Sequence, residues 1–531
     1  MKQILQSLAT GETQLAELPA PAPGPGQLLV RSSCSLVSAG TERMLVDFGK
    51  AGWAGKARQQ PERVRDVLDK VRSDGLLTTV EAVRSKLDQP LPLGYCNVGT
   101  VVALGDGVQG FSLGQRVVSN GPHAELVAVP RNLCAAIPDG VRDATAAFTV
   151  LAAIGLQGVR LAQPSFGETV LVSGLGLIGL LTAQLLRAQG CRVLGLDPSA
   201  DACALARSLG VEVLQLGGAD PVSWCQSRTD GIGVDAVLIT AATSSSEPVH
   251  VAAQSCRQRG RIVLVGVTGL ELRRDLFYKK ELSFQVSCSY GPGRYDPAYE
   301  QGGHDYPIGF VRWTEQRNFA AVLQSMAQGQ LQTDALISHR FGIAQAAEAY
   351  DLLSSDTPSL GILLSYPQTA DPAQRAVLLP QGEPADRSPA EPCLSVLGAG
   401  NHAARTLVPA LARAGARFDA IAASQGMAPA HVGRRHGFAL ASTDVAAVLR
   451  RDQSNAVVIA TRHDSHARLI CEALDAGKHC YVEKPLCLNR AELEQIERTY
   501  KATRAAALPP LLMVGFNRPL APLIVELRRQ P

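Results

Sequence analysis

Two groups of small residues, each directly after an apolar and strand-like run, have the spacing that binds the pyrophosphate of a dinucleotide. In such a motif the first glycine makes a tight turn, and the second lets the phosphates approach the N-terminus of a helix. The two runs are ETVLVSGLGLIGLL and CLSVLGAGNHAARTL. The small residues are Gly174, Gly176, Gly179, Gly398, Gly400 and Ala403. The sequence therefore predicts two dinucleotide-binding sites in one chain.

The residue that ends the next strand-like run predicts which cofactor each site takes. In the first half, RVLGLD ends at Asp197, whose carboxylate can accept hydrogen bonds from a ribose 2'-hydroxyl and repels a 2'-phosphate, which favours NAD. In the second half this place is taken by Ser424, with Arg434 and Arg435 further along. Without a carboxylate there, NAD and NADP both remain possible at the second site.

The elements that must position these residues are those of an α/β protein. Short apolar runs separated by Gly and Pro turns predict a β domain over residues 1–150, completed by residues 311–366. Residues 151–310 alternate strands with helices, which indicates a doubly wound parallel sheet, and residues 393–531 repeat this pattern. The Pro- and Ala-rich residues 367–392 are predicted to form a linker.

Composition excludes several classes of function. The chain of 531 residues has 46% hydrophobic residues and a net charge of +3, without basic runs interleaved with aromatics, so a nucleic-acid partner is not expected. No apolar stretch approaches the roughly 18 residues of a membrane span, and no secretory leader is evident, so we expect no membrane contact and a cytoplasmic location. The 12 cysteines form no CxxC pair, so neither a disulfide framework nor a zinc knuckle is expected.

Residues 61–87 interrupt the β domain with apolar residues at three- and four-residue spacing, which predicts two amphipathic helices. Such an insertion can pack on the surface, cover a site as a lid or form a dimer contact. We expect a homo-oligomer.

The first half resembles the medium-chain dehydrogenase/reductase superfamily over roughly residues 1–366. The segments that carry the resemblance are SAGTE, similar to its C-G-T-D, GYCNVGTVV, similar to its G-H-E-x-x-G-x-V, and AAFTVLAAIGLQG, similar to the segment before its nucleotide domain. The resemblance implies a GroES-like β domain, a Rossmann domain and hydride transfer with NAD.

The same resemblance predicts that no zinc is bound. The positions of the catalytic zinc ligands look like Ala39, Tyr95 and Thr149, and none of these side chains offers the thiolate, imidazole or carboxylate that zinc prefers. One alternative set of ligands remains: Cys34, Cys96 and His123.

Without zinc, another group must move a proton and stabilise charge on the substrate oxygen. The phenol of Tyr95 is our first candidate for this role, and the hydroxyl of Thr41 is the second; Tyr95 can also be a buried tyrosine with a satisfied hydroxyl. Residues 289–318 are rich in hydrogen-bonding side chains, which suits a polyhydroxylated or anionic substrate unless the loop folds on its own aromatics. The residues that carry this expectation are Tyr290, Arg294, Tyr295, Asp305, Tyr306, Arg312 and Glu315.

The second half resembles the glucose-fructose oxidoreductase/inositol dehydrogenase family (Gfo/Idh/MocA) through TRHDSHARLICEALDAGKHCYVEKPL. The resemblance implies that Glu483, Lys484 and Pro485 lie against the cofactor, with Lys484 as a general base for a sugar hydroxyl. His463 and His466 flank the same strand end, or simply begin a helix.

The resemblance also implies what should follow. GFNRP is similar to the family's G-F-N-R-R, after which a substrate domain is expected, yet only 13 residues follow Arg518. We therefore expect the substrate domain to be missing and Lys484 to lack a catalytic partner. The tandem as a whole resembles bacterial bi-domain oxidoreductases.

Three hypotheses follow. The first is zinc-independent hydride transfer on a carbinol or carbonyl carbon of a sugar or polyol. The second is reduction of a polarised double bond, as in quinone and enoyl reductases. The third is a non-catalytic dinucleotide-binding scaffold or redox sensor.

Overall fold

The computed structural model describes residues 1–51, 87–380, 391–505 and 507–529. The predicted helical insertion at 61–87 lies outside the described residues except for Leu87. No helix in the described ranges combines the length and the apolar character that a membrane span needs.

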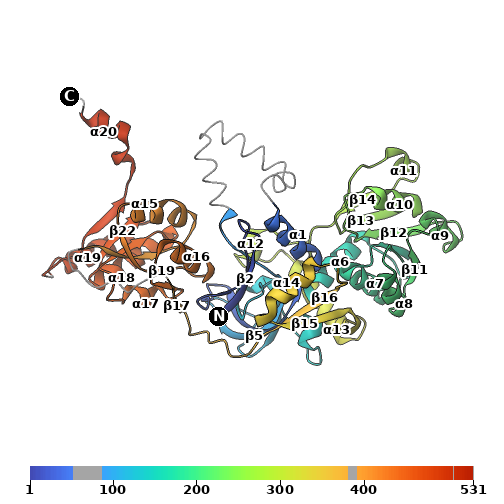
Figure 1. Cartoon of the computed structure of the whole chain (residues 1–531). Helices are drawn as coiled ribbons and strands as arrows, with labels where there is room; N and C mark the ends of the chain where they lie inside the picture. Colours follow the sequence, from blue (N-terminus) through green and yellow to red (C-terminus); the bar gives the residue numbers. More distant parts are fainter. Residues whose placement is uncertain (52–86, 381–390, 506, 530–531) are drawn as a thin grey trace.

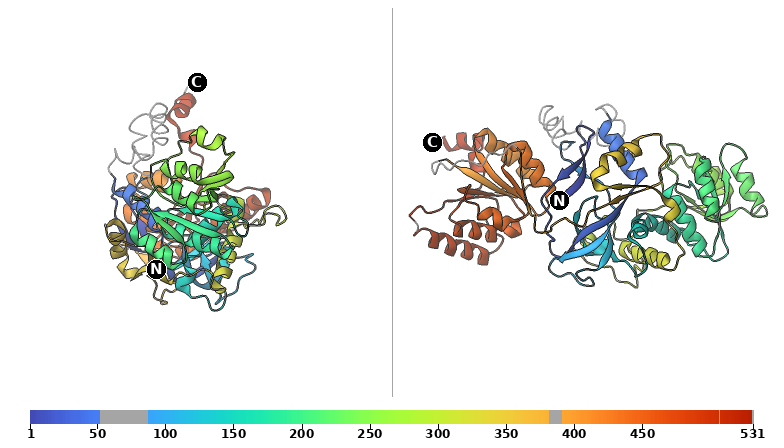
Figure 2. Two further views of the ribbon diagram at one scale, coloured as in Figure 1. Left: turned by 90° about the vertical axis from the view of Figure 1, so that its right-hand side faces the viewer. Right: turned by 60° about the horizontal axis from the view of Figure 1, so that its bottom comes forward.

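Three bodies follow one another in space, with the β domain in the middle (Figure 1). The first nucleotide-binding unit lies on one side of the β domain, and the second lies on the opposite side. The right-hand view of Figure 2 shows the same order. The described parts of the two nucleotide-binding units are therefore separated by the β domain.

The β domain is built around a sheet with the strand order β15-β16-β3-β5-β6-β8, in which β7 also pairs with β3. Strand β16 is antiparallel to β3, with Ile362 opposite Val37, so the chain returns to this sheet after the first nucleotide-binding unit. A small sheet of β2, β1 and β4 and the helices α1, α5 and α14 complete it. The bounds are β1 Lys2–Gln6, β2 Thr13–Glu17, β3 Gln27–Val37, α1 Ala39–Lys50, β4 Leu91–Pro92, β5 Asn97–Leu104, β6 Arg116–Ser119, β7 Leu126–Pro130, β8 Cys134–Ala136, α5 Asp143–Ala146, β15 Ile337–Gly342, α14 Ala346–Ser354 and β16 Gly361–Ser365.

The first nucleotide-binding unit has the parallel strand order β11-β10-β9-β12-β13-β14. This is the 3-2-1-4-5-6 order of a doubly wound dinucleotide-binding sheet. The bounds are α6 Thr149–Ala162, β9 Thr169–Ser173, α7 Leu177–Ala188, β10 Arg192–Asp197, α8 Ala200–Ser208, β11 Glu212–Gln215, α9 Pro221–Ser227, β12 Val234–Ile239, α10 Glu247–Ser255, β13 Cys256–Leu264, α11 Arg274–Tyr278, β14 Ser283–Val286, α12 Pro297–Glu300 and α13 Glu315–Ala327.

The second nucleotide-binding unit repeats that order as β20-β19-β18-β21-β22-β23 and adds β17 at one edge. Strand β17 is antiparallel to β20 and comes from the segment predicted to be a linker, so part of that segment belongs to the sheet. The bounds are β17 Ala376–Leu378, β18 Cys393–Leu397, α15 Val408–Arg413, β19 Arg417–Ala422, α16 Met427–His436, β20 Leu440–Ser442, α17 Val445–Leu449, β21 Ala456–Ile459, α18 His466–Asp475, β22 His479–Glu483, α19 Arg490–Thr503, β23 Leu512–Gly515 and α20 Pro522–Arg529. The predicted α/β class with two Rossmann sheets is confirmed.

An apolar cluster joins the second nucleotide-binding unit to the β domain. It contains Leu18 and Leu28 from one side, and Phe418 and Ile421 from the other, all of them buried. Thr443 adds a polar contact by donating its hydroxyl hydrogen to the Ala20 carbonyl. The second unit is therefore packed against the β domain through buried side chains, in addition to the covalent connection of the chain.

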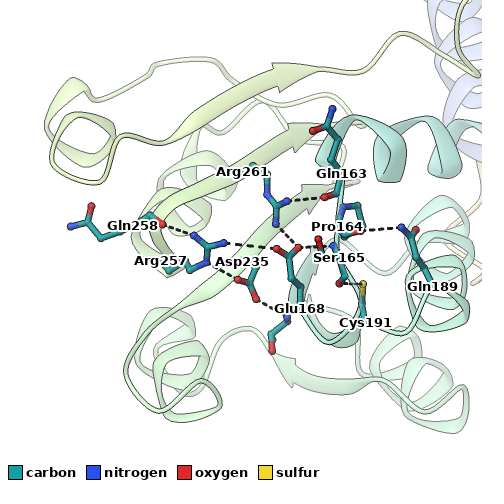
Figure 3. A network of polar contacts seen from close by, with 11 residues as sticks. Gln163, Pro164, Ser165, Glu168, Gln189, Cys191, Asp235, Arg257, Gln258 and Arg261 are labelled. Carbon is teal, nitrogen blue, oxygen red and sulfur yellow. Dashed lines mark hydrogen bonds and ion pairs between the residues drawn. The ribbon is translucent and has the colours of Figure 1, made fainter. Parts of the chain in front are cut away.

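A network of ion pairs braces the first sheet near the amino ends of its central strands (Figure 3). Glu168 accepts from Arg261, and Arg257 Nε donates to Asp235 Oδ1 at 2.6 Å. The other oxygen of Asp235 accepts from the backbone of Thr169 at 2.8 Å. The network lies at the edge opposite the carboxyl ends of the strands, where dinucleotides bind, so we assign it to stability.

Candidate functional sites

The glycine turn of the first unit needs each of its glycines for a different reason. Gly174 has φ +99°, and a Cβ there would lie 2.6 Å from the backbone nitrogen of Ala241. A Cβ on Gly179 would lie 1.9 Å from the Gly174 carbonyl oxygen, whereas a Cβ on Gly176 would meet nothing within 4 Å. The free space at Gly176 is what an approaching pyrophosphate requires.

Asp197 lies beside this turn, at the carboxyl end of β10. Its Oδ2 accepts from the backbone of Leu175 at 2.7 Å, and its Oδ1 accepts from the backbone of Ser199 at 2.8 Å. Each carboxylate oxygen retains acceptor capacity for a ribose hydroxyl. The turn, the carboxylate and the sheet order together fit a dinucleotide.

Tyr95 is held by two hydroxyl groups from the start of α1. Its phenol donates to Ser38 Oγ at 2.7 Å, and Thr41 Oγ1 lies 3.2 Å from the same phenol oxygen. Burial raises the pKa of Tyr95 far above its ordinary value. The phenol is therefore neutral at physiological pH and can donate a hydrogen bond. Thr41 is exposed to solvent.

Glu42, the residue that follows Thr41 in α1, is a fully buried carboxylate. Glu42 accepts from the backbone of Ser38 at 2.8 Å and from the hydroxyl of Tyr350. Its Oε2 also lies 3.2 Å from His123 Nε2, whose ring is buried as well. Because Glu42 joins α1, α14 and the segment before β7, it fixes the turn that carries the two hydroxyls holding Tyr95.

The residues at the expected metal position do not fit zinc. Tyr95 is a neutral phenol, Ala39 has no donor, and the buried Thr149 hydroxyl points to the sulfur of Met326 at 3.8 Å. These are not the ligands that zinc prefers.

The alternative zinc ligands do not form a site in the structure either. Burial raises the pKa of Cys34 to about 12 and also raises the pKa of Cys96, while His123 is engaged by Glu42 and Ser35. Across the described ranges, no three His, Cys, Asp or Glu side chains are grouped as a metal site.

The polar segment after β14 is largely folded on itself. Arg294 pairs with Glu300, Tyr306 donates to Asp296, and Arg317 pairs with Asp305. Of the two possibilities that the sequence left open, the self-packed loop is the one observed. These pairs leave fewer free polar groups for a substrate than the sequence suggested.

One contact links this segment to the β domain. Asn120, which directly follows β6, donates from Nδ2 to the phenol of Tyr290 at 2.5 Å. The polar segment is therefore tied to the end of β6.

The glycine turn of the second unit has the same backbone constraint at its first glycine and the same free space at its second. Gly398 has φ +104°, and a Cβ there would lie 2.4 Å from the Ala460 carbonyl oxygen, while Gly400 has free space around it. Ala403 is buried at the third position and begins a π-helical turn.

The residues expected to discriminate between cofactors at the second site lie apart from one another. Ser424 is exposed after β19, whereas Arg434 and Arg435 are in the last turn of α16, roughly 10 Å along the helix axis from its first residue. Arg434 donates to the Glu17 carbonyl, and Arg435 pairs with Asp88. Both arginines therefore contact the β domain.

Glu483, Lys484 and Pro485 lie at the carboxyl end of β22. Glu483 Oε1 is 3.2 Å from Nε2 of His402 and accepts from the phenol of Tyr481 at 3.1 Å. Lys484 is exposed, and its ammonium makes no ion pair within the described part of the chain. Lys484 directly follows Glu483, so it is the next residue in the chain after a histidine–carboxylate pair.

The two flanking histidines have different roles in the fold. His466 is fully buried and donates from Nδ1 to the Pro485 carbonyl at 2.7 Å, so it holds the turn that follows β22. His463 is exposed, with its ring centroid 5.6 Å from that of His466.

The sequence alone did not single out Ser38 and His402. Both carried a signal, because Ser38 begins SAGTE and His402 lies inside the second glycine motif.

Comparison with known proteins gives two family matches in one chain. The model described as zinc-binding dehydrogenase matches residues 178–301, and the model of an oxidoreductase family with an NAD-binding Rossmann fold matches residues 394–510. D-guloside 3-dehydrogenase of Escherichia coli is 27% identical over 269 residues, which cover 49% of this chain and 72% of that protein. Sorbitol dehydrogenase of Halalkalibacterium halodurans is 24% identical over 306 residues, covering 50% and 81%.

Among solved structures, alcohol dehydrogenase TADH from Thermus sp. ATN1 superimposes with a TM-score of 0.53 at 19% identity, covering 69% of this chain and 100% of that one. This likeness shows the fold of the β domain and the first nucleotide-binding unit. The chain is an NAD(P)-dependent oxidoreductase whose first half is similar to zinc-binding dehydrogenases and whose second half is similar to an oxidoreductase family with an NAD-binding Rossmann fold.

Proposed function

We propose that the first half interconverts a carbinol and a carbonyl on a sugar or polyol, with NAD and without zinc. The observation that carries the proposal is the phenol of Tyr95, held by Ser38 and Thr41. The resemblance to medium-chain dehydrogenases gives this position to a metal ligand. The relatives named D-guloside 3-dehydrogenase and sorbitol dehydrogenase support a polyhydroxylated substrate.

Each residue has a distinct part in this proposal. The turn at Gly174 and Gly176 receives the pyrophosphate, and Asp197 accepts from the adenosine ribose. Bound NADH supplies the hydride. Tyr95 donates its proton to the carbonyl oxygen as negative charge develops there, and the exposed Thr41 hydroxyl returns a proton from solvent.

The electrostatics of Tyr95 predict a preferred direction at neutral pH. Burial raises the pKa of this phenol, so the protonated form predominates. Reduction uses that form directly, whereas oxidation needs the phenolate as a base. We therefore expect the oxidation rate to increase with pH throughout the alkaline range, while the reduction rate stays level.

The test is Tyr95→Phe, measured as NADH-dependent reduction of fructose and other ketoses. Loss of one proton donor is expected to lower turnover by roughly 100- to 10,000-fold with NADH binding unchanged. Tyr278→Phe is the matched control, because that exposed ring lies on α11, away from the site. Turnover within threefold of the parent protein would refute the role of Tyr95, and loss of activity on chelation, restored by zinc, would refute the zinc-free reaction.

A further inference from the structure

We propose that the second nucleotide-binding unit has a proton-transfer site of its own, in which His402, paired with Glu483, is the general base beside Lys484. The ligand class is a secondary alcohol bound together with an oxidised nicotinamide dinucleotide. This activity is separate from the one proposed for Tyr95 and does not depend on it.

The pair is formed by two segments at the same edge of the sheet. His402 follows Gly400 in the glycine turn after β18, and Glu483 ends β22, so both lie at the carboxyl ends of parallel strands. Ligands of such sheets bind at this edge. A side chain that joins the turn to the end of β22 therefore lies where a bound dinucleotide and its substrate must meet.

The environment of each partner suits a histidine–carboxylate dyad. Glu483 is 15% exposed and anchored by the phenol of Tyr481, so its position is fixed. His402 is 54% exposed and approaches Glu483 through Nε2. Its Nδ1 has no hydrogen-bond partner in the described ranges and is open to a substrate. A carboxylate on one ring nitrogen stabilises the imidazolium that forms when the other nitrogen takes a proton.

The proposed oxidation removes a hydride and a proton from the alcohol, and the dinucleotide and His402 would accept them. The carbinol C–H bond breaks with hydride passing to the oxidised nicotinamide, and the hydroxyl proton passes to Nδ1 of His402. The ammonium of Lys484 stabilises charge on the substrate oxygen as the proton leaves. Because His402 is partly exposed, its proton then passes to water, which gives a ketone, reduced dinucleotide and one released proton.

The experiment uses the full chain with the first unit silenced by Gly176→Trp. A panel of sorbitol, xylitol, myo-inositol and gluconate is screened for NAD+ and NADP+ reduction. His402→Gln and Glu483→Gln are each expected to lower turnover by roughly 100-fold, without a change in dinucleotide affinity. Added imidazole should restore part of the rate to His402→Gln but not to Glu483→Gln. His436→Gln and Glu497→Gln are the controls, since those residues lie in the last turn of α16 and on the outer helix α19.

A second readout does not require turnover. Diethyl pyrocarbonate modifies exposed imidazoles, and mass spectrometry reports the rate at His402. We expect saturating NAD+ to slow this modification by about fivefold in Gly176→Trp, because a bound ligand covers most of its pocket. In Gly400→Trp no protection is expected.

The outcomes separate this inference from the function proposed for the first half. If His402 is modified equally fast with and without NAD+, or if Gly176→Trp binds NADH but oxidises nothing in the panel, the second site is not catalytic. Activity of the first half, measured in Gly400→Trp, is unaffected by either result.

Discussion

The two nucleotide-binding units have the same strand order and the same glycine turn, yet their surroundings differ. The first has Asp197 beside its turn and Tyr95 in the neighbouring β domain, held by Ser38 and Thr41. The second has an exposed Ser424 and a His402–Glu483 pair within its own sheet edge. This second unit contacts the β domain through β19 and α16. The Rossmann sheet therefore supplies a dinucleotide site, while the segments packed at its carboxyl edge decide the chemistry.

The largest expected effect comes from blocking each glycine turn separately. Gly176 and Gly400 have free space at Cβ and no positive φ, so a tryptophan is tolerated by the backbone and its indole fills the place of the pyrophosphate. We expect each substitution to remove one NADH site per chain and lower its affinity by roughly 1000-fold, or about 4 kcal/mol. Isothermal titration calorimetry counts the sites.

The matched controls are Gly176→Ala and Gly400→Ala, whose small side chains fit the same space. If the parent protein binds one NADH and Gly176→Trp alone abolishes that site, the second unit does not bind NADH. Loss of both sites with either tryptophan would show that the two units are coupled.

A buried carboxylate in the second unit is expected to give the next largest effect. Asp419 is fully buried and accepts two hydrogen bonds from Arg451, at 2.8 and 2.7 Å. Asp419→Asn leaves the guanidinium without its charge partner and should cost about 3 kcal/mol of unfolding free energy. Calorimetry should show this loss in the transition of the second unit. Glu472→Gln, at an exposed i,i+4 pair with Arg468, should change stability by less than about 0.5 kcal/mol.

The next prediction concerns the preference of each site for NADH over NADPH. Asp197→Ser removes the acceptor for the ribose hydroxyls, so we expect about tenfold weaker NADH binding at the first site and weaker discrimination against NADPH. Ser424→Asp is the reciprocal change and should make the second site prefer NADH. Titrations in the Gly400→Trp and Gly176→Trp chains isolate the two sites. Unchanged NADH/NADPH ratios in both variants would refute this assignment.

The last prediction depends on pH and concerns a buried carboxyl of the first half, which contrasts with Asp419. Neither oxygen of Glu315 has a hydrogen-bond partner within the described residues, and burial together with Glu300 raises its pKa to about 8. The unfolded chain releases this proton near pH 4.5 and the folded one near pH 8, so stability falls as pH rises between these values.

Glu315→Gln removes that dependence. We expect it to stabilise the protein relative to the parent by a few kcal/mol at pH 8.5 and by less at pH 5. Thermal unfolding at the two pH values checks this. An equal effect at both would show that Glu315 is ionised in the same range in the folded and unfolded chains.

The glycine turns show how much of the fold was predictable. Gly174 and Gly398 must adopt positive φ and pack against a neighbouring strand, and these constraints act within a few residues, so the sequence displays them directly. The insertion at 61–87 stays a prediction. The strand β17 was not predicted, because three residues without a turn signal join the sheet only through β20.

For the candidate sites, local motifs in the sequence identify the residue types: a phenol at a position that the resemblance gives to a zinc ligand, an aspartate after one glycine turn and a lysine after β22. The partners of these residues come from the tertiary structure, since Tyr95 meets Ser38 through the packing of α1 on the β domain, and His402 meets Glu483 across the edge of a parallel sheet. Proton transfer depends on such distances, and residues far apart in the chain acquire them only when the strands and helices that carry them pack together.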